Sequence, residues 1–275
     1  MTAFSPGGDL PHPPTARPAA EVVFRARGVS VSFGGVRAVA GVDLEIEAGE
    51  LVGLIGPNGA GKTTFIDAIT GFVRSEGTVE LGQTTLNRLP PHVRAQRGLA
   101  RTWQTVELFD DLTVRENLTV AAADTASPGG TTSRTPRWPA RWKGKEGASV
   151  EDELALLDLV AAADAMPAEL TQAERKRAGI GRALVAKPRL LCLDEPAAGL
   201  DTRQSREFGA LLPGIARTGT AVLLVDHDMG LVLSVCDRVV VLESGGVIAQ
   251  GTPAEIRGDE RVIAAYLGHA SAGAA

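Results

Sequence analysis

The segment GPNGAGKT (Gly56–Thr63) constrains the fold of this chain more than any other, because it fits the pattern G-x-x-x-x-G-K-[S/T]. The apolar run Gly49–Ile55 precedes it, and the helix-forming run Thr64–Ile69 follows it. Glycines let backbone N–H groups surround a phosphate, and the start of a helix adds its positive end. The order strand, phosphate-binding loop and helix therefore predicts the phosphate-binding unit of an α/β domain.

Two further apolar runs end in polar residues. Leu190–Leu193 leads into Asp194 and Glu195, and Ala221–Val225 is followed closely by His227. Open α/β sheets bind their ligands at the carboxyl ends of parallel strands, where one carboxylate can organise a metal ion and its water shell and the next can polarise an attacking water. These runs indicate buried parallel strands that carry the chemistry.

These motifs occur in the order found in a known family. The chain from Val22 to about Gly268 resembles the ATP-binding subunit of an ABC transporter. GPNGAGKTT is similar to the Walker A loop, Gln104 to the Q-loop glutamine, LLCLDEP to Walker B, AGLD (Ala198–Asp201) to the D-loop and His227 to the switch histidine. Phe33 falls where the family stacks an aromatic ring on adenine.

The resemblance implies an ATPase that uses ATP and Mg²⁺. It gives catalytic roles to Glu195, which activates water, to His227, which holds the γ-phosphate and water, and to Lys62 and Gln104. It assigns Mg²⁺ to Thr63, Gln104 and Asp194. The residues implied in nucleotide binding are Phe33, Gly56, Pro57, Asn58, Gly59, Ala60, Gly61, Lys62, Thr63 and Thr64, with Thr171, Ala173 and Asp201 acting on the nucleotide of the opposite subunit.

Within the family, the chain resembles most the ATPases of branched-chain amino acid importers. FGGVRAV, RTWQTVELFDDLTVRENL, DHDMGLVLSVCDRVVVLESGGVIAQGTP and the tail VIAAYLG carry this likeness, and lipopolysaccharide-export ATPases fit the tail less well. It implies integral-membrane permease subunits, a homodimer or a paralogous ATPase partner, and, indirectly, an extracytoplasmic substrate-binding protein. The expected location is the cytoplasmic face of the membrane, as a peripheral protein.

Composition limits the other classes of function. The 275 residues are 44% hydrophobic and carry a net charge of −5, which argues against a nucleic-acid partner. No stretch approaches the roughly 18 apolar residues that span a bilayer. Cys192 and Cys236 lie in apolar runs without metal-site spacing, so we expect buried thiols.

The expected fold class is α/β: a P-loop NTPase core of mostly parallel sheet, an antiparallel β subdomain and an inserted α-helical subdomain. Residues 1–21 form a Pro-rich tail that we expect to be disordered, residues 22–268 the ATPase domain, and residues 269–275 a short tail. The helical insertion covers about 106–183.

Within the insertion, residues 126–149 are rich in proline and glycine and also contain Trp138 and Trp142 among basic residues. Such a segment could contact lipid headgroups or the membrane subunit. We favour a flexible loop, since proline and glycine exclude a regular amphipathic helix.

The segment Leu170–Glu174 departs from the family signature LSGGQ. Thr171 keeps a hydroxyl group, but Ala173 replaces a glycine and Glu174 replaces the glutamine. Thr171 and Glu174 also form a capping-box pattern, so we expect a helix to begin here. The departure leaves an alternative open, an ATP-dependent dimerising regulatory module with little turnover. A soluble, non-transport ABC ATPase is a further alternative, although it would need coiled-coil insertions or a tandem second ATPase domain.

Overall fold

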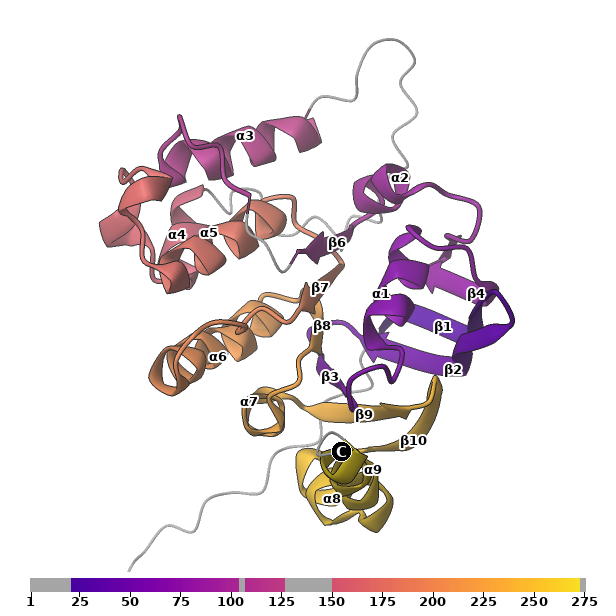
Figure 1. The fold of residues 1–275 in the computed structure, drawn as a ribbon. Coiled ribbons are helices and arrows are strands. Elements are labelled where there is room, and N and C mark those ends of the chain that lie inside the picture. The colour runs from indigo at the N-terminus through magenta and orange to yellow at the C-terminus, as the bar shows by residue number, and fades with distance from the viewer. Residues whose placement is uncertain (1–20, 104–106, 127–149, 273–275) are drawn as a thin grey trace, which may run out of the picture.

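A computed structural model describes residues 21–103, 107–126 and 150–272 of the chain. Three predicted features therefore lie almost wholly outside the described residues: the Pro-rich amino-terminal tail, Gln104 and the loop at 126–149. Of the predicted carboxyl-terminal tail at 269–275, residues 269–272 belong to the last helix and only 273–275 lie outside. Two sheets and the helices around them form the described structure (Figure 1).

One sheet is antiparallel and has the strand order β2-β1-β4-β5. Its strands are β1 (Val22–Phe33), β2 (Val36–Glu47), β4 (Glu76–Leu81) and β5 (Thr84–Thr85). In β2 the side chains of Val42, Leu44 and Ile46 are buried, whereas the acidic residues between them are exposed. This alternation leaves one face of the sheet for the core, and it confirms the predicted antiparallel β subdomain.

The second sheet is mostly parallel and has the order β10-β9-β3-β8-β7-β6. Only β10 runs antiparallel to its neighbour. Its strands are β3 (Leu51–Ile55), β6 (Leu99–Thr102), β7 (Leu190–Asp194), β8 (Ala221–Val225), β9 (Arg238–Glu243) and β10 (Gly246–Gly251). Every residue of β3, β7 and β8 is buried, as their continuous apolar runs predicted.

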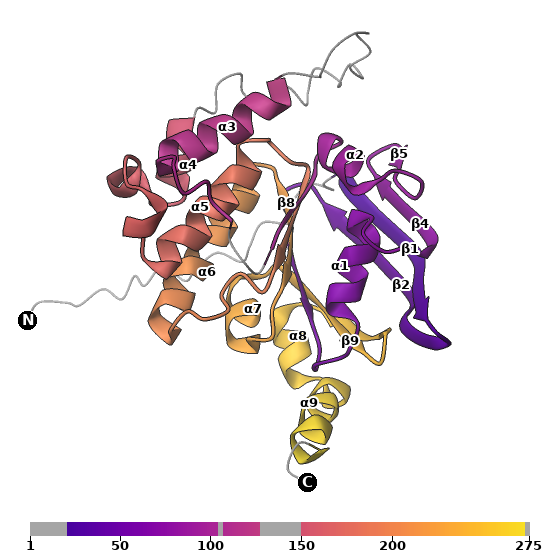
Figure 2. The same cartoon turned by 45° about the horizontal axis from the view of Figure 1, so that its top comes forward.

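The helices lie on different sides of this parallel sheet (Figure 2). On the side of the antiparallel sheet are α1 (Lys62–Thr70) and α2 (Pro91–Gln96). On the other side are α3 (Val114–Ala126), α4 (Val150–Leu156), α5 (Gln172–Leu184), α6 (Thr202–Arg217) and α7 (Met229–Val235), with 3₁₀ turns at Val160–Ala162 and Pro167–Glu169. The carboxyl-terminal helices are α8 (Pro253–Gly258) and α9 (Glu260–Ala272).

Alternate residues of the central strands fill two separate cores. Leu190 and Cys192 pack in the core that contains α1, whereas Leu191 and Leu193 pack in the core that contains α3 to α7. The fold is thus the predicted P-loop NTPase core with an inserted helical subdomain. The described residues include no helix that is both long enough and apolar enough to cross a membrane.

Candidate functional site: a phosphate loop facing two carboxylates and a histidine

The phosphate loop closes around its own lysine. Lys62 is the first residue of α1 and is only 7% exposed, and its Nζ donates to the carbonyl oxygens of Gly56 at 2.7 Å and Pro57 at 3.1 Å. Gly61 caps this helix with a φ of 101°, and a Cβ there would lie 2.3 Å from the carbonyl oxygen of Ala38. The left-handed backbone and the lack of space both require glycine.

The charge of Lys62 is surrounded by carboxylates. Burial lowers the pKa of Lys62, and the negative charges of Glu195, Asp194 and Asp226 oppose that effect. Lys62, which is predicted to hold phosphates, therefore lies close enough to Asp194 and Glu195 to interact with their charges. These two carboxylates are the ones predicted to organise metal and water.

The ends of β7 and β8 bring Glu195 and His227 close together. The backbone N–H of Glu195 donates to the carbonyl oxygen of Val225 at 2.7 Å, which ties the two strand ends. The Nδ1 atom of His227 lies 3.9 Å from Oε2 of Glu195 and 3.6 Å from Oδ1 of Asp226. Glu195 has a φ of 47°, a left-handed conformation that costs a non-glycine residue roughly 1–2 kcal/mol.

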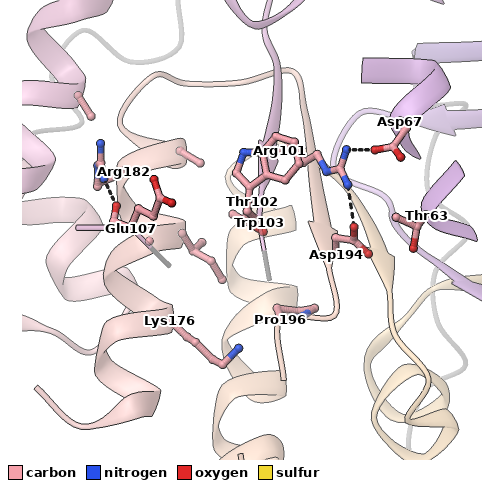
Figure 3. A pocket seen from close by; sticks show the side chains of 14 residues that line it. Thr63, Asp67, Arg101, Thr102, Trp103, Glu107, Lys176, Arg182, Asp194 and Pro196 are labelled. Atoms are coloured by element: carbon pink, nitrogen blue, oxygen red, sulfur yellow. Dashed lines mark hydrogen bonds and ion pairs between the residues drawn. The ribbon is translucent and has the colours of Figure 1, made fainter. Parts of the chain in front are cut away.

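Asp194 is held by an arginine that the sequence did not point to. Arg101 on β6 donates from one nitrogen to Oδ2 of Asp194 at 2.8 Å and from another to Oδ1 of Asp67 at 2.5 Å. Figure 3 shows the guanidinium between the two carboxylates, with Thr63 beside Asp194. Thr63, Asp67, Arg101 and Asp194 all line one cavity of about 820 Å³.

This cavity suits a hydrated Mg²⁺. Within the described residues, Oδ1 of Asp194 is buried without a hydrogen-bond partner. A buried carboxylate oxygen is costly unless something satisfies it, and Mg²⁺ takes oxygen ligands while it keeps several waters. Thr63 and Asp194 therefore fit a Mg²⁺ site, whereas Gln104 lies outside the described residues.

The start of α5 confirms the predicted capping box. Glu174 accepts hydrogen bonds from the backbone N–H of Thr171 at 2.8 Å and from its hydroxyl at 2.7 Å, and the Glu174 N–H donates back to that hydroxyl at 3.3 Å. The hydroxyl and N–H of Thr171 lower the pKa of Glu174, so its carboxylate is ionised at neutral pH. The altered signature thus carries a fixed negative charge.

The other predicted residues lie at helix and strand ends. Asp201 caps α6 by accepting from the N–H of Gln204 at 2.8 Å, and Ala173 is partly buried in the first turn of α5. Thr171, Ala173 and Asp201 all begin helices on the side of the sheet opposite α1 (Figure 2). Phe33 ends β1 with 52% of its surface exposed.

Sequence reasoning missed Arg101 and Asp67. The available signal was weak: an arginine inside the short strand Leu99–Thr102 must be paired when that strand is buried. No local sequence pattern indicates that Arg101 pairs with Asp67 and Asp194.

Known proteins place the chain in a family. Residues 39–198 match the family described as ABC transporter, and residues 247–272 match the one described as branched-chain amino acid ATP-binding cassette transporter. The high-affinity branched-chain amino acid transport ATP-binding protein LivG of Salmonella typhimurium is 39% identical over 88% of this chain and 96% of its own length. The lipopolysaccharide export system ATP-binding protein LptB of Escherichia coli is 34% identical over 88% of this chain and 96% of its own length.

A solved structure agrees with these relatives. The ADP conformation of MJ1267, an ATP-binding cassette of an ABC transporter, superposes with a TM-score of 0.75 at 26% identity, covering 90% of this chain and 99% of that one. The phosphate loop, the carboxylates at the end of β7 and the histidine after β8 occupy one site on this shared fold. The chain therefore belongs to the ABC transporter family as an ATP-binding ATPase subunit, related to those of branched-chain amino acid importers.

Proposed function

We propose that this chain hydrolyses Mg-ATP to power the import of branched-chain or related amino acids through a membrane permease. The carboxyl-terminal match at residues 247–272 supports the importer class, and so does the higher identity to LivG than to LptB. An extracytoplasmic binding protein would deliver the cargo, while this subunit works at the cytoplasmic face of the membrane.

Each part of the site has a role in phosphoryl transfer. Lys62 binds the β- and γ-phosphates together with the backbone N–H groups of the loop. Thr63 and Asp194, with Gln104, would hold Mg²⁺, which would neutralise charge on the phosphates when bound. Glu195 accepts a proton from the attacking water, and His227 beside it holds the γ-phosphate and that water. The exposed ring of Phe33 stacks on adenine.

The observation that carries the proposal is the position of the signature relative to the phosphate loop. Thr171, Ala173 and Asp201 begin helices across the parallel sheet from α1 (Figure 2), which supports a role for them at a nucleotide held by another subunit. In this proposal two ATP-binding subunits act together, either two copies of this chain or this chain with a paralogous ATPase.

Transport by reconstituted proteoliposomes tests the proposal. The chain is combined with candidate multi-span permease subunits and a candidate binding protein from the same organism, and uptake of radiolabelled leucine is measured with internal ATP. We expect uptake that stops with Glu195→Gln. Leucine uptake equal in wild type and Glu195→Gln would refute the importer function.

The altered signature favours a second function, an ATP-dependent dimerising regulatory module. Glu174 adds a negative charge where the γ-phosphate of a partner would approach. This second function is supported if turnover by the fully assembled complex does not exceed that of Glu195→Gln.

A further inference from the structure

Arg101 joins the two structural elements that carry the proposed metal ligands. Its side chain is only 6% exposed, and its guanidinium pairs with Asp67 on α1 and with Asp194 at the end of β7. Asp67 follows Thr63 by four residues, which places both on the same face of α1. One planar group thus spans the gap between the helix of Thr63 and the strand of Asp194.

The two oxygens of Asp194 are in different environments. Oδ2 accepts from Arg101 at 2.8 Å, whereas Oδ1 is buried and has no hydrogen-bond partner within the described residues. A carboxylate fixed through one oxygen cannot rotate freely, so the other oxygen keeps a defined direction. Asp194 lines the same cavity as Thr63 (Figure 3).

We infer that Arg101 is a positioning residue for the Mg²⁺ that accompanies ATP: it holds Asp194 by one oxygen, leaves the other for the ion, and sets the spacing between Asp194 and Thr63. This inference rests on the proposed Mg-ATP site. In this role Arg101 acts through the metal ligand Asp194 and does not itself contact the nucleotide.

The same guanidinium lies over an exposed aromatic pair. Arg101 is 4.3 Å from the ring centre of Trp103 and 5.9 Å from that of Phe72, and the two rings meet edge to face at 5.0 Å. Trp103 is 52% exposed. Because the guanidinium contacts both Asp194 and Trp103, a change at the metal site alters the surroundings of the Trp103 indole.

Manganese binding in the presence of ADP tests the positioning role without any turnover. Free and bound Mn²⁺ are measured by electron paramagnetic resonance for wild type, Arg101→Met and Arg101→Lys. Outer-shell partners of metal ligands are worth about 10–100-fold in metal affinity, so we expect a loss of that order for Arg101→Met. Arg101→Lys keeps the charge but cannot bridge both carboxylates, so we expect a smaller loss in the same direction.

The two variants separate geometry from charge. Arg101 could instead act only as a positive charge that repels the metal ion. Arg101→Met would then bind Mn²⁺ more tightly than wild type, and Arg101→Lys, which keeps the charge, would bind it with wild-type affinity. That pattern, or unchanged affinity in both variants, would overturn the inference. If Arg101→Met fails to fold, Arg101→Lys alone decides between these outcomes.

Arg182→Met is the matched control. Arg182 lines the same cavity and lies 4.8 Å from the ring centre of Phe109, but it donates a hydrogen bond to the carbonyl oxygen of Glu107 rather than to a metal-site carboxylate. We expect Arg182→Met to bind Mn²⁺ with wild-type affinity. If Arg101→Met and Arg182→Met lost Mn²⁺ affinity equally, the loss would be a general effect on the cavity, and this result would also overturn the inference.

Tryptophan emission gives a second readout. The substitutions Trp138→Phe and Trp142→Phe leave Trp103 as the single tryptophan. Mg²⁺ added to the ADP complex should then shift Trp103 emission, and Arg101→Met should remove the shift. A failure of the proposed Mg-ATP site is recognised separately, because wild type would then bind neither ADP nor Mn²⁺ with ADP.

Discussion

Replacing Glu174 by glutamine should raise the ATPase rate of the purified chain. Its carboxylate lies 2.7 Å from the Thr171 hydroxyl, the group that we propose meets the γ-phosphate held by the opposite subunit. This hydroxyl has a single proton, so it must release Glu174 in order to donate to a phosphate oxygen about 2.7 Å away. The carboxylate and the phosphate would then be no more than about 5.5 Å apart.

The electrostatic cost follows from that separation. Two unit charges about 5.5 Å apart repel by about 3 kcal/mol at an effective dielectric constant near 20, and by about 0.8 kcal/mol in bulk water. Each 1.4 kcal/mol corresponds to about tenfold in rate, so we expect Glu174→Gln to accelerate hydrolysis by between about fourfold and about 140-fold. High salt should reduce the gain, because it screens the charges.

The substitution leaves the helix start intact. Glutamine serves as well as glutamate in a capping box, so the melting temperature of the variant should stay within a few degrees of wild type. Adding Ala173→Gly removes the methyl group that crowds the approach of the partner's phosphate and should raise the rate further.

The protein supplies a matched control in Glu255→Gln. Thr252 and Glu255 form the same capping box at the start of α8, with bonds of 2.8 and 2.9 Å to the carboxylate. ATP hydrolysis is measured by phosphate release at saturating Mg-ATP. Glu255→Gln should match wild type. A wild-type chain that already turns over several times a second, unchanged by Glu174→Gln with Ala173→Gly, would refute the argument.

Four other predictions test separate parts of the structure. Lys62→Ala should abolish ATP binding in calorimetry, because the buried charge on the phosphates is lost; unchanged affinity would contradict the site. Glu195→Gln should bind ATP but hydrolyse it at least about 10²-fold more slowly, leaving an ATP-bound dimer visible by size exclusion; a wild-type rate would exclude a general base. Deleting residues 126–149 with a Gly/Ser bridge should leave nucleotide binding intact, and loss of the thermal transition would show that the segment belongs to the core. Burial raises the pKa of Cys192 to about 12 and that of Cys236 still further, so iodoacetamide at pH 8 should label neither thiol until the protein is unfolded; labelling of the folded chain would show that the thiols are accessible.

The sequence predicted those features that depend on local patterns. The phosphate loop was found because glycines, a lysine and the flanking strand and helix occur within a short stretch. The capping box of Thr171 and Glu174 was found for the same reason. The Arg101 pairs join residues 34 and 93 positions apart, and no local pattern specifies such partners. The roles of Gln104 and of residues 126–149 stay predictions.

The two halves of the nucleotide site differ in what this chain contributes. Among the described residues of its own half-site, Lys62 is buried within the phosphate loop, Asp194 is held by Arg101, and Glu195 lies close to His227. The signature that it offers to a partner carries a capped but charged helix start. Two copies of this chain would therefore place that charge at both ATP molecules, whereas a paralogous ATPase with a neutral signature would leave one site unimpaired. We accordingly expect slow hydrolysis by the chain alone and faster hydrolysis beside such a partner, with the unimpaired site built on Lys62 and Glu195 of this chain.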